Sequence, residues 1–405
     1  MDKKIVEVPV LDQWKREIGK FEGKIEGHNI IFFGGIHGNE IAGVQALNIV
    51  SEQLKQIKGN FKGNFYALAG NLKALKAKKR YLSHDLNRIW FPVCRIPVSE
   101  RAKVPEYSEK IELIKAILKI LENQRPTILI DLHTTSAQSI PFVSISDTLK
   151  NRRITDSIPT PLVLGLEELL DGPMFSFYSE QGLPTILFEG GQHESPASIQ
   201  NHVAFIWWIL NKTGCLKKKQ IPEFHKYIEI LKANSLNENR VFELKYRYII
   251  ENGEKFKMKD GFANFEPIKK GQTLAKNQKG KILAPRSGRI FLPLYQPQGI
   301  DGFFIIKEIN PVWIRLSKRT RKWRIENVLA LLPGVQKEKE IKNAYVIDKS
   351  IALWRVLPIF HLLGYRKVTN NGHCITVSRR PYDRRFPKTS TVVRHINQYL
   401  KEITS

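Results

Sequence analysis

Three short runs of apolar residues stand out in the first half of the chain, and each leads into polar residues. The runs are Ile30-Ile31-Phe32-Phe33, Thr127-Ile128-Leu129-Ile130 and Leu183-Pro184-Thr185-Ile186-Leu187-Phe188. Such runs predict strands that are buried on both faces, as in a sheet covered by helices. Helical patterns occur at 40–50, 108–121, 198–210 and 222–233. Up to about residue 236 the sequence therefore predicts an α/β fold, with a parallel or mixed sheet and helices on both faces.

The pattern changes after about residue 237. Short alternating stretches are broken there by turn signals such as Asn252-Gly253 and Lys270-Gly271, which predicts a small β domain with tight turns. Beyond residue 316, helical patterns at 351–363 and 392–400 and a turn signal at Asn370-Asn371-Gly372 predict an α+β appendage. We expect three domains, at 1–236, 237–316 and 317–405, and the sequence assigns no role to the last.

The first two apolar runs deliver candidate metal ligands. The first leads into Gly34-Gly35-Ile36-His37-Gly38-Asn39-Glu40, and the second ends in Asp131-Leu132-His133. Two histidines and one carboxylate form a set that holds catalytic zinc and leaves a position open for water. Because strand ends meet at one edge of such a sheet, we expect His37, Glu40 and His133 to bind one zinc ion. Alternate side chains of a strand share a face, so Asp131 is expected to hydrogen-bond the other ring nitrogen of His133.

The third run ends in Glu189, which is followed by Gly190 and Gly191. A carboxylate delivered by a buried strand, with glycines after it that let a substrate approach, fits a general base that takes a proton from metal-bound water. A strand-end glutamate that faces solvent is the alternative, and for Glu189 taken alone it is the better one. A lone histidine in a glycine-rich turn is likewise more often an ordinary loop residue. The coincidence of the three strand ends favours the chemical interpretation.

A basic segment at 78–88 lies between the first two runs and contains Arg80, Asp85, Asn87 and Arg88. Fixed cations beside zinc suit a reaction whose transition state carries an oxyanion and whose substrate carries a carboxylate. A charge run of this kind is usually a solvated helix face. Asp85 and Asn87 are poor residues for a helix interior, however, and favour turns.

In this order, the patterns GGxHGNE, RYxxxDLNR, DLHTTS and a strand-end glutamate followed by glycines resemble the succinylglutamate desuccinylase and aspartoacylase family. Its members are zinc-dependent deacylases related to the zinc carboxypeptidases. The resemblance covers roughly residues 28–210. It implies that His37, Glu40 and His133 bind zinc and that Glu189 is the general base.

The same resemblance also assigns roles to residues of the basic segment at 78–88. It implies that Arg80 helps to polarise the scissile carbonyl and that Asn87 and Arg88 bind the carboxylate of the substrate. Asp85 would orient these cations. For the β domain, the segment around Gly271 and Ser287-Gly288 resembles the lipoyl-like β barrel of the family and could shape the entrance to the site.

Two features depart from the aspartoacylase branch. That branch has a further carboxylate-binding arginine about ten residues before the base, whereas here the position falls near Ser179 and no arginine lies between Asp171 and Glu189. The branch also contributes a tyrosine from its C-terminal domain, and the nearest position here is Phe265, which lacks a hydroxyl. The resemblance therefore implies the reaction type and leaves the substrate open.

Charge raises a second question about partners. The chain of 405 residues has a formal net charge of +26, and residues 318–405 supply half of it, with 19 Lys and Arg against 6 Asp and Glu. Such an excess is typical of contact with nucleic acid or an anionic surface, although a lysine-rich composition gives the same result. The best local candidate for a phosphate-binding patch comprises Arg379, Arg380, Arg384 and Arg385, interleaved with Tyr382 and Phe386. No recognised nucleic-acid-binding motif accompanies it.

Other features point to a cytoplasmic protein that does not enter membranes. The N-terminal ten residues have no long apolar core behind them, and the longest apolar run, 205–210, is too short to cross a bilayer. The three cysteines are an odd number at wide spacings, which suits a reducing compartment.

Three functions remain open from the sequence. The first is a zinc amidohydrolase that removes the acyl group from an N-acyl amino acid. The second is a zinc carboxypeptidase that acts on peptides, which would share the ligands. The third is a catalytically idle, basic binding protein built on a hydrolase scaffold. The complete set of ligands, base and arginines favours the first two, and the oligomeric state is not predicted.

Overall fold

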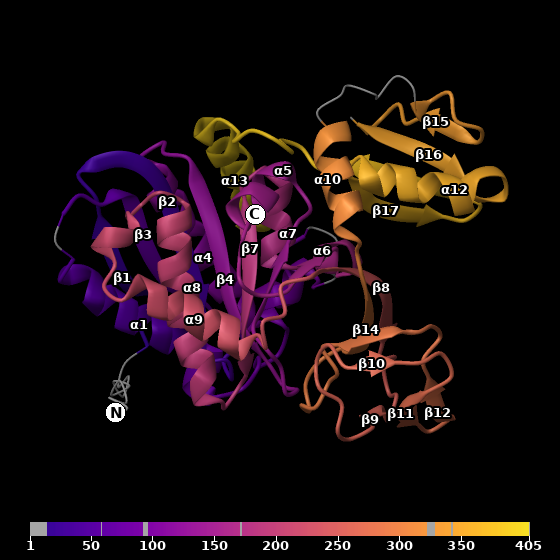
Figure 1. Ribbon diagram of the computed structural model, residues 1–405, viewed down its shortest axis with the longest axis horizontal. Coiled ribbons are helices and arrows are strands. Elements are labelled where there is room, and N and C mark those ends of the chain that lie inside the picture. Colours follow the sequence, from indigo (N-terminus) through magenta and orange to yellow (C-terminus); the bar gives the residue numbers. More distant parts are fainter. Residues whose placement is uncertain are drawn as a thin grey trace.

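The computed structural model describes residues 14–57, 59–91, 96–170, 172–321, 329–341 and 343–404. An 11-stranded mixed sheet is its main feature, with the strand order β1-β3-β2-β4-β7-β5-β6-β8-β14-β13-β10 (Figure 1). The strands of its first half are β1 (Glu17–Glu22), β2 (Ile25–Gly34), β3 (Lys62–Ala69), β4 (Thr127–Thr135), β5 (Phe142–Ile145), β6 (Leu162–Leu164) and β7 (Thr185–Gln192). The three apolar runs become β2, β4 and β7, as predicted.

The middle of the sheet is parallel. β2 pairs with β3 and β4, and β4 pairs with β7, all in the parallel sense. Phe33 lies opposite Asp131, and His133 lies opposite Glu189. The carboxyl ends of β2, β4 and β7 therefore meet at one edge of the sheet. The prediction of a mixed α/β sheet is confirmed.

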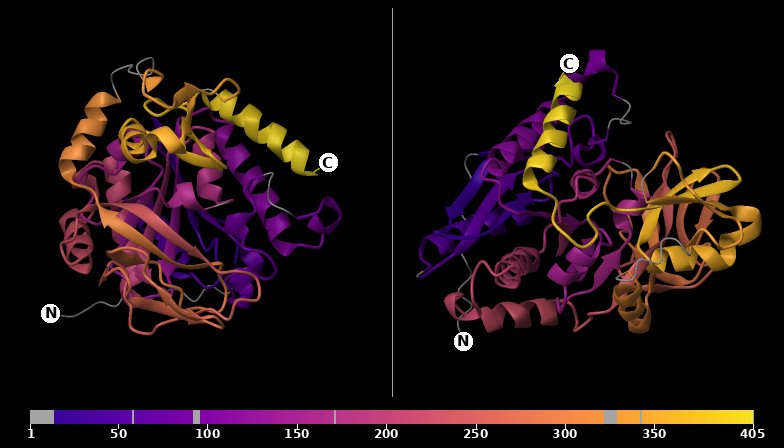
Figure 2. Two further views of the ribbon diagram at one scale, coloured as in Figure 1. Left: turned by 90° about the vertical axis from the view of Figure 1, so that its right-hand side faces the viewer. Right: turned by 90° about the horizontal axis from the view of Figure 1, so that it is seen from above.

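Helices cover both faces of this sheet (Figure 2). On one face α1 (Ala42–Lys55), α8 (Pro196–Lys212) and α9 (Phe224–Asn234) share an apolar core with side chains of β2 such as Ile30 and Phe32. On the other face α4 (Pro105–Leu121) and α7 (Met174–Glu180) pack against the alternate side chains, Ile31 and Phe33. The alternation along β2 thus divides one continuous apolar run between two cores. The four predicted helices of this region are all present.

Shorter helices connect these elements. They are α2 (Leu72–Ala77), η1 (Leu86–Arg88), α3 (Val98–Arg101), α5 (Leu149–Ile154), α6 (Leu166–Leu169) and η2 (Lys218–Gln220). Of these, η1 lies in the basic segment predicted to form turns rather than a continuous helix. Among the described residues, no helix is long and apolar enough to cross a membrane.

A small β unit continues the same sheet. Its strands are β8 (Val241–Ile249), β9 (Lys257–Met258), β10 (Pro267–Ile268), β11 (Thr273–Asn277), β12 (Gly280–Leu283), β13 (Gly288–Phe291) and β14 (Asp301–Glu308). β8 pairs in parallel with β6, so that Leu162 lies opposite Val241, and β14 pairs with β8 in the antiparallel sense. A second sheet, β12-β11-β9, encloses a separate apolar core with the first. The main sheet therefore runs without a break from the α/β region into the β unit.

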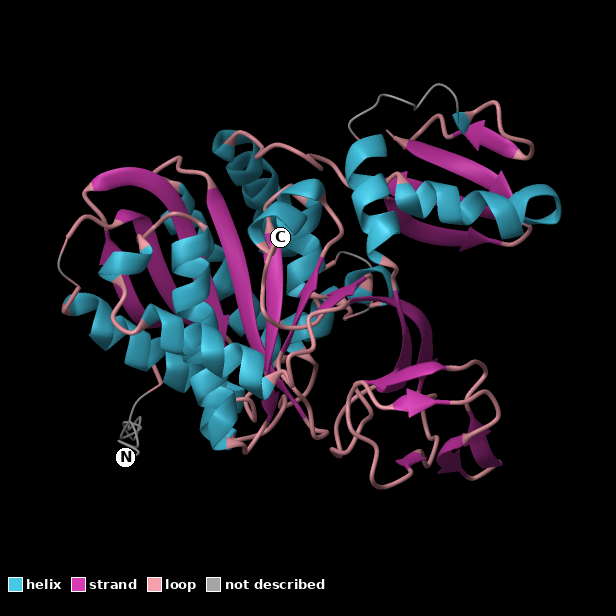
Figure 3. Ribbon diagram, in the orientation of Figure 1, coloured by secondary structure: helices cyan, strands magenta, loops and turns pink. Residues whose placement is uncertain are grey.

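The C-terminal unit has its own sheet (Figure 3) and its own apolar core. Its strands β15 (Val335–Lys337), β16 (Ala344–Asp348), β17 (Tyr365–Asn371) and β18 (Cys374–Arg379) form an antiparallel sheet in the order β15-β16-β18-β17. The helices α10 (Pro311–Thr320) and α12 (Lys349–Leu362) contact each other, and α12 packs on the sheet. The predicted turn joins β17 to β18.

The last helix, α13 (Thr389–Thr404), leaves this unit and returns to the α/β region. It packs on α4, and Val392, Ile396 and Ile403 join the core on that face of the main sheet. The hydroxyl of Tyr107 in α4 donates a hydrogen bond of 2.9 Å to the backbone oxygen of Ile403. One face of α13 thus contributes to the core of the α/β region.

A buried ion-pair network also joins the C-terminal unit to the α/β region. Asp147 lies 2.6 Å from Arg152 of α5, 2.7 Å from Arg321 and 3.6 Å from Arg366. The side chain of Arg321 is fully buried. Part of the excess positive charge at 317–405 is therefore neutralised within the fold.

Some residues of the predicted phosphate-binding patch contact the rest of the fold, whereas others are exposed. Arg379 forms an ion pair with Asp383, whose carboxylate accepts a hydrogen bond of 3.0 Å from the backbone of Leu149. Phe386 packs against His28, with ring centroids 5.3 Å apart. Arg384 and Arg385 are exposed. The segment 379–386 connects to the α/β region, and these contacts do not test nucleic-acid binding, for which the sequence has no recognised motif.

Candidate active site

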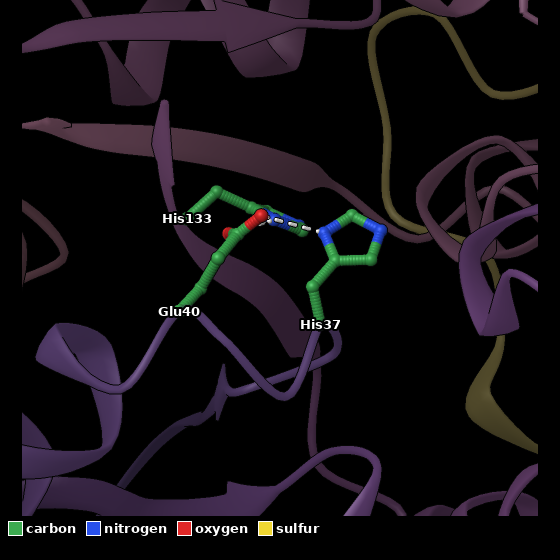
Figure 4. A group of neighbouring side chains, drawn as sticks. All are labelled: His37, Glu40 and His133. Carbon is green, nitrogen blue, oxygen red and sulfur yellow. Dashed lines mark hydrogen bonds and ion pairs between the residues drawn. The ribbon is translucent and has the colours of Figure 1, made fainter. Parts of the chain in front are cut away.

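The turn after β2 and the end of β4 bring the three candidate metal ligands together. His37 and Glu40 lie in the turn, and His133 lies in β4. The Glu40 carboxylate sits between the two rings, with Oε1 at 2.8 Å from His37 Nδ1 and Oε2 at 2.9 Å from His133 Nδ1 (Figure 4). All three residues are buried, and one candidate ligand atom from each lies within 4.8 Å of the others.

Each histidine turns its other ring nitrogen toward a second carboxylate. His37 Nε2 lies 3.1 Å from Asp85 Oδ1, and His133 Nε2 lies 2.9 Å from Asp131 Oδ2. The second pair is at ion-pair distance but is not aligned as a hydrogen bond. A carboxylate in this place keeps the proton on Nε2 and leaves Nδ1 free to bind a metal. The donor set and its surroundings therefore fit zinc.

The electrostatics of this group favour a cation. Burial disfavours charge on His133, but Asp131 and Glu40 outweigh burial and hold the pKa of His133 well above its usual value. Burial also opposes ionisation of Glu40, yet His37 and His133 hold the pKa of Glu40 well below its usual value. The site thus retains a proton on His133 next to an ionised Glu40. A divalent ion bound here would displace that proton.

Asp85 links the histidine site to the predicted catalytic arginine. Its Oδ2 lies 3.2 Å from Arg80 Nη2. Its Oδ1 accepts a hydrogen bond of 2.8 Å from the backbone of Asn87, so that Asp85 caps the N-terminus of η1. Arg80 Nη1 lies 3.4 Å from Glu40 Oε1. Burial opposes ionisation of Asp85, but His37 and Arg80 hold the pKa of Asp85 well below its usual value. One ionised carboxylate thus positions His37 and Arg80 together.

The predicted substrate-binding pair has partners of its own. Asn87 is buried, and its side-chain oxygen accepts a hydrogen bond of 3.0 Å from the backbone of Met174. Arg88 Nη2 lies 2.8 Å from Asp301 Oδ2, at the start of β14. Asp301 also lies 2.7 Å from Arg247 Nε. Arg88 therefore faces the site as a member of an ion-pair cluster.

Glu189 projects into the same site from the end of β7. Its side chain is buried, and among the residues that the structure describes its Oε2 has no hydrogen-bond partner. Burial raises the pKa of Glu189 to about 8. A buried carboxyl group without a partner lowers stability, so its presence at a strand end is better explained by chemistry than by packing. A cation on the neighbouring ligands would lower this pKa again.

His202 of α8 contacts the ends of β4 and β7. Its Nε2 lies 3.0 Å from the backbone oxygen of His133, and burial lowers the pKa of His202 to about 4, so the ring is neutral. A Cβ at Gly190 would lie 2.3 Å from His202 Cε1. We expected glycine after Glu189 to let a substrate approach, but at position 190 it admits the His202 ring.

A single pocket gathers these side chains. It has a volume of about 110 Å³, and its lining includes every predicted site residue except Asp131, which lies behind His133. The apolar part of the lining includes Leu166, Leu170 and Leu187. Ser179, where the missing arginine would fall, is buried in α7 and does not line the pocket, and Phe265 packs in a core against Phe142 and Phe291.

The loop 292–300 of the β unit forms another wall of this pocket. Gln296 accepts a hydrogen bond of 3.0 Å from Asn39 and lies 3.3 Å from His193 Nε2, while Gln298 contacts the backbone of Tyr81. His193 Nδ1 in turn lies 2.8 Å from Thr134 Oγ1. The sequence did not identify these residues. Its only signal is that β13 and β14 are joined by a loop long enough to carry function.

Comparison with known proteins identifies the first region. Residues 26–200 match the family model described as the succinylglutamate desuccinylase/aspartoacylase catalytic domain. A succinylglutamate desuccinylase of Photorhabdus laumondii is 37% identical over 62 residues, which cover 15% of this chain and 19% of that protein. The chain thus matches about a fifth of the length of this curated relative.

Solved structures extend the similarity of fold. The succinylglutamate desuccinylase/aspartoacylase of Rhodobacter sphaeroides aligns with a TM-score of 0.53 at 15% identity, over 71% of this chain and 87% of that one. The succinylglutamate desuccinylase of Vibrio cholerae aligns with a TM-score of 0.52 at 13% identity, over 70% and 82%. At such identities these similarities establish the fold alone.

Proposed function

Because residues 26–200 belong to the succinylglutamate desuccinylase/aspartoacylase family, we propose that this protein is a zinc-dependent amidohydrolase that removes the acyl group from an N-acyl amino acid. The observation that carries the proposal is the meeting of His37, Glu40 and His133 in one pocket with Glu189, whose Oε2 has no hydrogen-bond partner among the described residues.

We propose that His37 Nδ1, His133 Nδ1 and the Glu40 carboxylate hold one zinc ion per chain. When bound, zinc lowers the pKa of water and polarises a carbonyl group. The fit is supported by the two carboxylates behind the histidines, since Asp85 and Asp131 keep each Nε2 protonated.

The remaining chemistry falls to Glu189 and Arg80. Glu189 accepts a proton from the attacking water as the water oxygen bonds to the amide carbon, and it returns that proton to the leaving nitrogen as the carbon–nitrogen bond breaks. Arg80, held by Asp85 beside Glu40, donates to the oxyanion that develops on the carbonyl oxygen. Arg88 and Asn87 bind the carboxylate of the amino acid. The products are a carboxylic acid and a free amine.

The loop 292–300 supports a role of the β unit in shaping the pocket, which we propose as the function of a lipoyl-like domain at 237–316. The unit at 317–405 is proposed as a basic appendage attached through α13 and Asp147. The odd number of cysteines supports a cytoplasmic location.

A direct comparison of substrates tests the proposed reaction. Zinc-loaded protein should release leucine from N-acetyl-L-leucine faster than from the peptide Gly-Gly-L-Leu. Faster cleavage of the peptide would instead support the carboxypeptidase alternative. If the protein binds no zinc and cleaves neither compound, the idle binding protein is the better account.

A further inference from the structure

The catalytic pocket is small for the substrate that the proposed function requires. Its volume of about 110 Å³ is well below the roughly 300–1,000 Å³ that is usual for a small-molecule site. Under the proposed function, the scissile amide and the carboxylate of the amino acid both lie in this pocket. These groups fill most of it, so an acyl group longer than acetyl extends beyond the pocket.

A second cavity, in the β unit, adjoins the catalytic pocket. It has a volume of about 700 Å³, so the two cavities together reach the size of an ordinary ligand site. Four residues line both cavities: Leu294, Gln296, Gly299 and Ile300. Gln296 is held by a hydrogen bond of 3.0 Å from Asn39, the neighbour of the candidate ligand Glu40. The second cavity therefore adjoins the pocket on the side of the metal ligands, where the acyl group of a substrate begins.

The junction of the two cavities is largely apolar. Leu294 and Ile300 line both, and Ile300 is 47% exposed. Ile250 lines only the second cavity, and its backbone N–H donates a hydrogen bond of 2.8 Å to the oxygen of Ile300. Within the described part of the chain, none of these three side chains belongs to an apolar core. Their apolar surface is thus available to a ligand, and each methylene buried against it strengthens binding about fourfold.

Charged side chains farther along the lining limit what the end of a bound chain can carry. Three of them are acidic, Glu251, Glu254 and Asp260, and one is basic, Lys257. A carboxylate at the end of an acyl chain would meet more negative than positive groups there, which disfavours its binding. The second cavity therefore fits an uncharged chain.

We propose that the second cavity is a subsite for the acyl chain, and that the substrates are N-acyl amino acids whose acyl group is an uncharged, apolar chain longer than acetyl. This inference rests on the proposed function, because it concerns the substrate of the same site. It gives the β unit a part in the selection of the acyl group.

Different acyl groups on one amino acid provide the test. Zinc-loaded wild type should hydrolyse N-hexanoyl-L-leucine with a kcat/KM at least about tenfold above that for N-acetyl-L-leucine, because each added methylene contributes up to about fourfold when buried. N-adipoyl-L-leucine has a chain of the same length that ends in a carboxylate. Its kcat/KM should be about tenfold or more below that of the hexanoyl compound.

Two neighbouring isoleucines provide a matched pair of variants. Ile250→Asn removes apolar surface from the second cavity only, and it should lower the ratio of hexanoyl to acetyl kcat/KM by about fourfold. Ile249→Asn is the control, since Ile249 is 52% exposed and lines neither cavity, and it should leave the ratio unchanged. The rate with the acetyl compound reports whether each variant has kept an intact catalytic pocket.

Three results would overturn the inference. The first is an equal kcat/KM of the wild type for the hexanoyl and acetyl compounds. The second is faster hydrolysis of the adipoyl than of the hexanoyl compound. The third is a ratio that falls equally in Ile250→Asn and Ile249→Asn, or in neither, because the chain would then lie outside the second cavity.

Binding of the released acids separates this inference from the proposed function. By calorimetry, zinc-loaded wild type should bind hexanoate about tenfold or more tightly than acetate, and Ile250→Asn should reduce the difference. This selectivity without any hydrolysis would refute the proposed function and leave the subsite standing. Hydrolysis together with equal binding of both acids would refute the inference alone.

Discussion

Replacing Asp85 with Asn should weaken both the metal site and the catalytic arginine. Asp85 accepts contacts from His37 at 3.1 Å and from Arg80 at 3.2 Å, one at each of its two oxygens. Both partners are donors, and an asparagine has only one oxygen to offer them. Its NH₂ group must therefore face a donor. The substitution also removes a negative charge, which Asp85 carries at neutral pH because its pKa is well below the usual value.

The loss of a carboxylate behind a zinc-binding histidine typically costs about 10–100-fold in metal affinity. We expect a loss in this range for Asp85→Asn, equivalent to about 1.4–2.7 kcal/mol. Competition with a chromophoric chelator would measure it. At saturating zinc, kcat should still be lower by about tenfold or more, because Arg80 has lost its anchor beside the developing oxyanion.

Asp131→Asn is the matched control, since Asp131 contacts His133 and does not contact Arg80. It should lower zinc affinity, while kcat at saturating zinc stays close to that of the wild type. The reasoning would be refuted by an Asp85→Asn variant with unchanged zinc affinity. It would also be refuted if both variants had the same kcat once zinc is saturating.

Three further predictions concern stability. Arg321→Met removes a fully buried partner of Asp147 and should lower the free energy of unfolding in urea by about 3 kcal/mol, while Arg319→Met at an exposed position should not; equal midpoints would contradict this. Burial lowers the pKa of Lys150 to about 7, so the folded chain binds fewer protons than the unfolded chain between pH 7 and about 10. Wild-type stability should therefore gain a contribution as the pH rises through this window, and Lys150→Met should lack it; parallel pH profiles would argue against the burial of a neutral amine. Gly190→Ala places a Cβ against the His202 ring and should cost about 1–3 kcal/mol in thermal or urea unfolding, and an unchanged stability would show that this ring can move aside.

The metal ligands and Glu189 could be located from sequence because each follows a buried apolar strand. Parallel strands bring their carboxyl ends to one edge, so positions 37, 133 and 189 converge without any knowledge of the loops. The spacing of His37 and Glu40 within one turn supplied the carboxylate ligand. Local pattern and a general rule of sheet geometry were sufficient here.

The particular residues that the β unit contributes to the pocket could not be predicted in this way. Asp301 and Gln296 reach the pocket because β8 pairs with β6 and carries β14 with it, and strand pairing over such distances leaves no local trace in sequence. The pattern of α13 likewise predicted a helix but not the surface on which it packs. For the same reason the ion pair between Arg88 and Asp301 at the pocket was missed.

The central claim is that Glu189 performs the proton transfers of a zinc amidohydrolase. Its most direct test is to measure zinc content and amine release from N-acyl amino acids for the wild type and Glu189→Gln side by side. We predict about one zinc ion per chain in both proteins, with amine release by the wild type only. A wild type without zinc, or a Glu189→Gln variant that remains active, would contradict the account.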